Sequence, residues 1–200
     1  MGGNTTGSPN SQPHVAAFDE LLQRVEHELL RAQEHFDNWE AIFPTQQVID
    51  VLNRYVGFFR PTIDAHIAQF FIKVANVTGT DQRLPSLYRL FKMIEEHADL
   101  APNVNIKTLR SRLKAQRQLL ERVRKFRDTR IAHFDTTIKP DAVLFGESRS
   151  LLQELEDVFN EIRIAHKGRR KAFDWWGQQH DAKELLCTLE EAHAQRSKDL

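Results

Sequence analysis

The chain has 200 residues, 40% of them hydrophobic, and its 28 basic and 28 acidic side chains give a net charge of zero. This length predicts one main domain, and the balanced charge excludes an overall polyanion-binding character, so any such surface must be local. The lone cysteine, Cys187, excludes a disulfide framework and a cysteine-rich zinc site and favours a reducing, cytoplasmic setting. Residues 1–13 are rich in Gly, Ser, Thr, Asn and Pro, which predicts a disordered tail.

The first predicted helix covers residues 15–43. Its apolar residues recur every three or four positions, as on one buried helix face: Phe18, Leu21, Val25, Leu29, Ala32, Phe36, Trp39 and Phe43. The opposite face is acidic, with seven Asp or Glu against two Arg. This pattern predicts an amphipathic helix that packs one side into a core.

The second predicted helix covers residues 46–77 and is apolar on nearly all sides, which is typical of the centre of a bundle. Pro61 is expected to kink it near Gly57 or to split it, because proline removes a backbone donor and clashes with the preceding turn. A shorter third helix follows Ser86, and Asn105 is the predicted N-cap of a fourth helix.

The fourth predicted helix runs from residue 106 to about 134, and a fifth covers residues 149–166. Asp181 and Glu184 have the spacing of a capping box, which predicts the start of the last helix. No strand pattern and no apolar run long enough for a membrane span occurs. We therefore predict an all-α antiparallel bundle over residues 14–178, with the 179–200 helix packed on or beside it.

Basic residues are concentrated in the fourth predicted helix. Residues 104–134 contain ten Lys or Arg and two Asp or Glu, a net charge of +8, so the rest of the chain carries −8. Such segregation is typical of a surface that binds nucleic-acid phosphates. A solvated helix face paired with the acidic first helix explains the same pattern, and composition alone leaves both readings open.

Arg127 stands at a position of this helix where an apolar residue is expected. At about 100° per residue it lies about 20° from Leu120 on the helix surface. A buried guanidinium is costly unless it is paired, so this position predicts a carboxylate partner, a subunit contact or a ligand. Asp64 in the second helix is one candidate partner, and snorkelling of the long side chain to water is the alternative.

His133 lies six residues after Arg127, about 120° around an ideal helix and about 9 Å further along it. The two side chains therefore do not stack within one helix. Convergence across a two-fold axis with a second chain is the arrangement that this spacing favours. The nine histidines show no metal-binding motif and no glycine-rich phosphate loop occurs, so we expect no metal and no cofactor.

Three stretches, LNRYVGFFRPTIDAHIAQFFIKVANVTG, LPSLYRLFKMIEEH and RDTRIAHFD, follow one another along the chain. Their order resembles the AbiU-type abortive-infection branch of the HEPN superfamily, over roughly residues 15–165. The HEPN signature, an Arg, a polar residue and a His after four to six intervening residues, corresponds to Arg127, Asp128 and His133. The stretch RPTIDAH has a similar spacing, but a proline follows its arginine. A second RIAH, ending at His166, has no arginine at the required distance.

The resemblance implies a HEPN-like four-helix core with extra C-terminal helices, and a metal-independent endoribonuclease that acts as a homodimer on RNA. It implies catalytic roles for Arg127 and His133, with Asp128 orienting one of them, and phosphate contacts from Arg124, Lys125 and Arg130. Asp64 and Asp135 are expected to support the site. The implied setting is phage defence or a toxin held by an antitoxin protein, with no membrane partner. The alternative is a non-catalytic helical module that binds a protein or nucleic acid.

Overall fold

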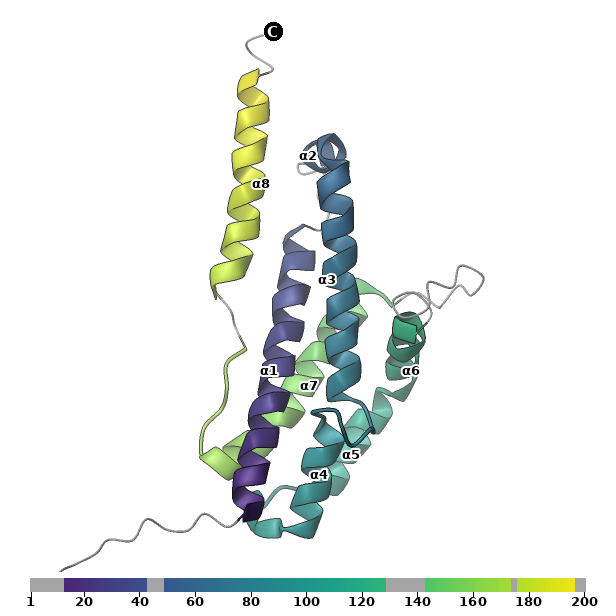
Figure 1. Cartoon of the computed structure of the whole chain (residues 1–200), viewed down its shortest axis with the longest axis vertical. Helices are drawn as coiled ribbons and strands as arrows, with labels where there is room; N and C mark the ends of the chain where they lie inside the picture. Colours follow the sequence, from purple (N-terminus) through teal and green to yellow (C-terminus); the bar gives the residue numbers. More distant parts are fainter. Residues whose placement is uncertain (1–12, 43–48, 129–142, 174–175, 197–200) are drawn as a thin grey trace, which may run out of the picture.

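A computed structural model describes residues 13–42, 49–128, 143–173 and 176–196, and all regular structure within them is helical, which confirms the all-α prediction. The helices are α1 (Pro13–Ala41), α2 (Ile49–Arg54), α3 (Val56–Val77), α4 (Leu87–Glu96), η1 (Ala98–Leu100), α5 (Ile106–Ala115), α6 (Arg117–Phe126), α7 (Phe145–Lys167) and α8 (Trp176–Arg196). In Figure 1, α1 lies alongside α3 and α7, and α8 stands beside the upper part of the bundle.

The first helix forms as predicted and supplies the centre of the core. All seven apolar positions of its stripe that the structure describes, from Phe18 to Trp39, are buried. Two contacts with each neighbour show that α3 and α7 run antiparallel to α1. Glu28 and His35 meet Lys73 and His66 of α3, and Asp19 and Glu26 meet His166 and Arg163 of α7. The predicted antiparallel bundle is therefore confirmed around α1.

The predicted second helix is two helices, because the backbone leaves the helical region at Tyr55. Pro61 lies within α3, in exposed turns where water can satisfy the carbonyl that proline leaves without a donor. The second half of α3 is buried, as expected of a central helix. The first turn is not, since Val56 is 53% and Phe58 61% exposed. The prediction fails there because this end of α3 extends beyond the main bundle (Figure 1).

The predicted fourth helix is also divided, at Gln116, whose N–H donates to the carbonyl of Leu113 only three residues back. The apolar stripe nevertheless continues across the break, with Leu113, Leu120 and Val123 all buried. At its start, Asn105 is the N-cap as predicted, and its side chain accepts a hydrogen bond from the N–H of Thr108 at 3.2 Å.

The last two helices begin earlier than predicted. Helix α7 starts at Phe145 and ends at Gly168, whose φ of +71° suits a glycine C-cap. Helix α8 starts at Trp176, so Asp181 lies inside the helix and the predicted capping box at its start is wrong. A small second cluster, Ile42, Val51, Phe59 and Leu186, joins α8 to the upper end of the bundle. Among the described helices, none combines the length and apolar character needed to cross a bilayer.

Candidate functional site at the end of helix α6

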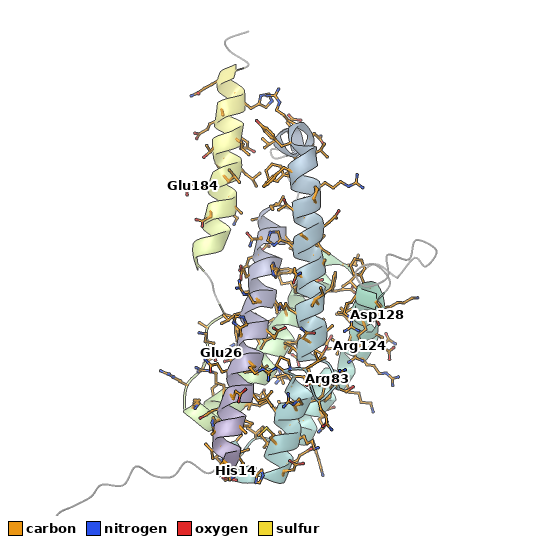
Figure 2. All side chains as sticks on the ribbon, viewed as in Figure 1. His14, Glu26, Arg83, Arg124, Asp128 and Glu184 are labelled. Carbon is orange, nitrogen blue, oxygen red and sulfur yellow. The ribbon has the colours of Figure 1, made fainter. Side chains whose placement is uncertain are left out.

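Arg127 and Asp128 directly follow α6, where the backbone widens into a π-helical turn. Arg127 Nε donates to Asp128 Oδ1 at 2.8 Å, and its Nη2 lies 2.6 Å from the same oxygen. The arginine side chain is 32% exposed and the aspartate 53%. The pair therefore lies at the surface, where a ligand from solvent can reach it (Figure 2).

Helix α6 is held against the end of α3 by three contacts. Leu120 and Val123 are buried in the main core, and the ring of Phe126 lies 4.8 Å from that of Phe71. Arg124 Nη2 donates to the carbonyl of Thr78, just after α3, at 2.9 Å. These contacts fix the direction in which α6 delivers Arg127 and Asp128.

The contact with Asp128 leaves part of the Arg127 guanidinium available. Arginine carries five N–H donors in a planar fork, and the Nε and Nη2 sides face the carboxylate. Within the described part of the chain, no acceptor is recorded at the Nη1 edge. An arginine held in one orientation by a neighbouring carboxylate, with a free donor edge, is suited to an anionic group such as a phosphate.

Of the other predicted site residues, three are described by the structure and three are not. Asp64 is exposed on α3, so it is not the buried carboxylate that Arg127 was expected to need; the observed partner is Asp128. Lys125 is exposed beside the pair, whereas Arg124 binds a backbone carbonyl. The remaining three predicted residues, Arg130, His133 and Asp135, lie outside the described residues.

Four of the eight basic residues of α5 and α6 form ion pairs with carboxylates of the described residues. As one of the two alternatives, a solvated helix face was expected to pair with α1, but the observed partners lie on α4, α6 and α7. The pairs are Arg110 with Glu95, Arg112 with Glu154 and Glu161, Arg117 with Glu121, and Arg122 with Glu147. Two hydrogen bonds lower the pKa of Glu147, the one from Arg122 with the larger effect and the one from the Leu144 N–H with the smaller. The local surplus of +8 is therefore much reduced in the folded bundle.

The second RIAH sequence has a structural role. His166 Nδ1 donates to the carbonyl of Leu100 at 2.6 Å, and Nε2 lies 2.7 Å from Asp19 Oδ1. Burial would raise the pKa of Asp19, but hydrogen bonds from Lys167 and His166 outweigh it and the pKa is lowered. His166 thus links α7, η1 and α1. The second RIAH stretch therefore has a structural role that is separate from the Arg127 motif, in which the first RIAH stretch lies.

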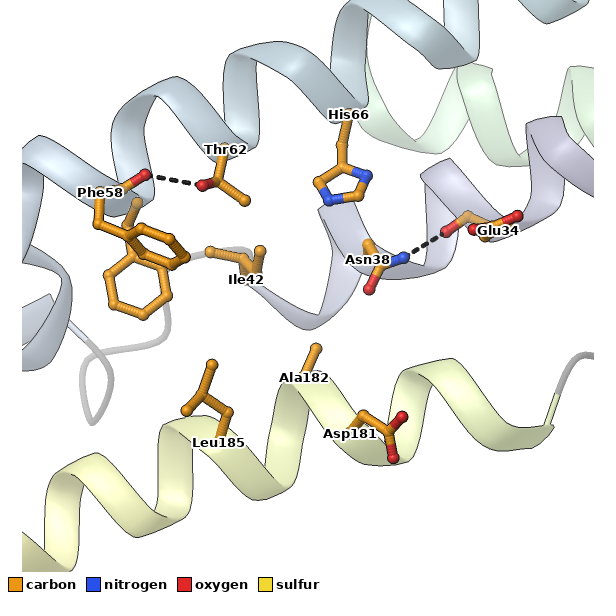
Figure 3. Close-up of a pocket in the computed structure, with 10 residues that line it drawn as sticks. Glu34, Asn38, Ile42, Phe58, Thr62, His66, Asp181, Ala182 and Leu185 are labelled. Atoms are coloured by element: carbon orange, nitrogen blue, oxygen red, sulfur yellow. Dashed lines mark hydrogen bonds between the residues drawn. The ribbon is translucent and has the colours of Figure 1, made fainter.

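A pair of histidines between α1 and α3 was not predicted from the sequence. The Nδ1 atoms of His35 and His66 are 3.0 Å apart, so one ring donates and the other accepts. Burial lowers the pKa of both, and the charge of His66 lowers that of His35 further, against the opposing effect of Glu34. His66 also borders a cavity of about 330 Å³ between α1, α3 and α8, with Asn38 at its polar end and Phe58 at its apolar end (Figure 3).

The family model AbiU2, of the HEPN type, matches residues 16–185. The helical bundle and the arginine-aspartate pair agree with a HEPN-type protein. The chain belongs to the AbiU2 family of HEPN domains, the family of abortive-infection proteins. The match continues through α7 and into α8, further than the predicted limit near residue 165. Comparisons with curated proteins and with solved structures gave no match.

Proposed function

We propose that this protein is a metal-independent endoribonuclease that acts as a homodimer in phage defence. Arg127 and His133 are the catalytic residues, and Asp128 positions the arginine. Lys125 and Arg130 hold flanking phosphates. The AbiU2 match supports this proposal, and the observation that carries it is the surface-exposed Arg127–Asp128 pair, in which the carboxylate holds the Nε and Nη2 side of the guanidinium.

The proposed reaction needs a base and a group that stabilises negative charge on the phosphate. His133 removes the proton from a ribose 2′-OH, a role for which an imidazole with a pKa of about 6.5 is suited near neutral pH. The 2′-oxygen attacks the adjacent phosphorus, the bond to the 5′-oxygen breaks, and the leaving oxygen takes up a proton. The phosphate oxygens gain negative charge in the transition state, and Arg127 stabilises that charge. The products are a 2′,3′-cyclic phosphate and a 5′-hydroxyl.

The homodimer is proposed from the six-residue spacing of the two catalytic residues in the sequence. On one ideal helix, His133 lies about 120° around from Arg127 and about 9 Å further along. Two copies related by a two-fold axis bring the arginine of one chain toward the histidine of the other. Light scattering coupled to size-exclusion chromatography tests this expectation, and a strictly monomeric protein at the concentrations that cleave RNA contradicts it.

Cleavage is tested by incubating the purified protein with total cellular RNA in EDTA, beside Arg127→Ala and His133→Ala. We expect fragments with 5′-hydroxyl ends from the wild type and a loss of at least about 100-fold in rate for each variant. Arg117→Ala is the matched control, because Arg117 is an α6 arginine with a 73% exposed side chain that pairs with Glu121. It should cleave at the wild-type rate.

Two results overturn the catalytic assignment. Equal cleavage by the wild type and both variants places the activity elsewhere in the chain. Intact RNA in every lane, including lanes with RNA from phage-infected cells, removes the ribonuclease proposal. Circular dichroism of each variant separates loss of the site from loss of the fold.

A second function, a non-catalytic protein-binding module, is favoured by one observation. Four of the five arginines of α5 and α6 are paired with carboxylates of the same chain, which reduces the attraction for a polyanion. The two functions differ in the salt dependence of RNA binding. A polyanion-binding enzyme should lose RNA affinity steeply between 50 and 200 mM salt, as is typical of phosphate contacts, whereas a protein-binding module should show no RNA affinity to lose.

A further inference from the structure

Three side chains from distant parts of the sequence meet at the lower end of the bundle. His14 lies in the first turn of α1, His97 ends α4, and Asp99 lies in η1. The rings of His14 and His97 are stacked, with centroids 4.3 Å apart and planes inclined by 12°. His14 Nε2 lies 3.4 Å from Asp99 Oδ2. A ligating atom from each of the three lies within 4.8 Å of the other two.

The geometry points to a binding site for a divalent transition-metal ion of the zinc type, formed by His14, His97 and Asp99. Two imidazoles and one carboxylate are a donor set that suits Zn²⁺ and its neighbours Co²⁺ and Ni²⁺ better than the harder Mg²⁺ or Ca²⁺. Three protein ligands leave a fourth position for water. The site is separate from the proposed cleavage site, since His14 lies at the foot of the bundle and Asp128 beside α6 (Figure 2).

The distances fit such an ion with small side-chain movements. A tetrahedral Zn²⁺ with ligands at about 2.0–2.2 Å keeps its ligating atoms roughly 3.3–3.6 Å apart. The separation of 3.4 Å between His14 Nε2 and Asp99 Oδ2 already falls in this range. His97 and Asp99 are exposed, so their side chains can rotate to complete the geometry without disturbing the core.

The donor set can carry one negative charge, because Asp99 supplies a carboxylate and a metal ion would bind the neutral imidazoles of His14 and His97. A bound ion would join the start of α1 to the connection between α4 and η1. These segments are 83 or more residues apart in sequence, so binding requires the folded bundle and stabilises it.

The test uses the full-length, untagged chain after treatment with EDTA and removal of the chelator. Isothermal titration with Zn²⁺ should show one ion per chain. Co²⁺ should give the visible absorption of a site with nitrogen and oxygen ligands. At a free Zn²⁺ concentration about one hundred times the dissociation constant, the midpoint of thermal unfolding should rise by roughly 5 to 10 °C.

Two variants and one control decide the assignment. His97→Ala and Asp99→Asn should each weaken Zn²⁺ binding by more than about 100-fold and abolish the thermal shift. Loss of a residue that only supports a metal ligand typically costs roughly 10- to 100-fold in affinity. Asp99→Asn preserves the side-chain shape at an exposed position, so its fold is retained. His27→Ala, at an exposed histidine of α1, should bind Zn²⁺ as the wild type does.

Absence of Zn²⁺ binding by the wild type overturns the site, and so does unchanged binding by both variants. The proposed RNA cleavage is measured in EDTA, so that proposal stands or falls without the metal site. Conversely, Zn²⁺ binding by an Arg127→Ala chain should equal that of the wild type.

Discussion

His35 and His66 face one another across the α1–α3 contact with Nδ1 atoms 3.0 Å apart, surrounded by Glu34, Arg31 and Lys73. Their hydrogen bond exists only while at least one ring is neutral. Burial lowers the pKa of both rings below the ordinary value of 6.5, and repulsion between them lowers that of His35 further. The contact is therefore built for neutral histidine.

This pair predicts that the protein loses stability in mild acid. Between the lowered folded pKa values and 6.5 the unfolded chain binds more protons than the folded one, so the free energy of unfolding rises with pH in that window. Urea unfolding at pH 5.5 and 7.5 measures the slope. His66→Gln should reduce it, because one titrating group is removed.

The exposed His27, on the same helix as His35, provides the control for this prediction. His27→Gln should leave the pH slope as it is in the wild type. An equal reduction by both substitutions, or a wild-type free energy of unfolding that is flat over this range, would show that the pair contributes nothing to the pH dependence.

At the scale of helices, Arg124 joins α6 to the end of α3 through the carbonyl of Thr78. We predict that Arg124→Ala lowers the free energy of unfolding by about 1–2 kcal/mol, because a partly buried carbonyl loses a charged donor. Chemical denaturation measures this loss. Arg117→Ala, at the exposed start of the same helix, should change stability by less than about 0.5 kcal/mol. If both variants are as stable as the wild type, Arg124 is free for the phosphate contact that the sequence analysis assigned to it.

Sequence patterns predict a helix well when its environment is uniform along its length. Helix α1 keeps one face in the core from Phe18 to Trp39, so a single periodicity describes it. Helix α3 is buried in its second half and exposed at Phe58, a change that a wholly apolar sequence does not encode. The spacing of Asp181 and Glu184 is common inside helices, so it could not locate the start of α8.

At the scale of the whole molecule, α8 is largely separate from the main core. The described members of that core come from the helices before α8 and from Phe173, whereas Leu186 of α8 belongs to the small second cluster. A chain that ends after residue 173 should therefore still unfold cooperatively. We expect its unfolding midpoint to fall by at least about 4 to 8 °C, because the burial of Leu186 is lost and Ile42, Val51 and Phe59 lose its cover.

Calorimetry of the shortened chain measures both quantities. Leu186→Ala in the full-length protein should give a smaller shift in the same direction, because it removes one buried side chain while the rest of α8 still covers the cluster. A shortened chain that unfolds without a cooperative transition would show that α8 belongs to the main folding unit.

A functional feature could be predicted from the sequence when its residues are neighbours in the chain. The Arg127–Asp128 pair joins neighbours, so the motif was visible in the sequence, and its contact now agrees with a positioning role for the aspartate. The partners of the α5 and α6 arginines lie on other helices, and local charge counting could not identify them. The metal cluster joins residue 14 to residues 97 and 99, which no spacing rule connects.

The antiparallel contact of α1 with α7 also bears on how the protein is made. The hydrogen bonds from Arg163 to Glu26 and between His166 and Asp19 span 137 and 147 residues. During synthesis, these bonds cannot form until α7 has been made. Arg127 and Asp128 are translated earlier, and the contacts of α6 with Phe71 and Thr78 can form before α7 is made. A nascent chain therefore completes the packing around α1 only after α7 has been synthesised.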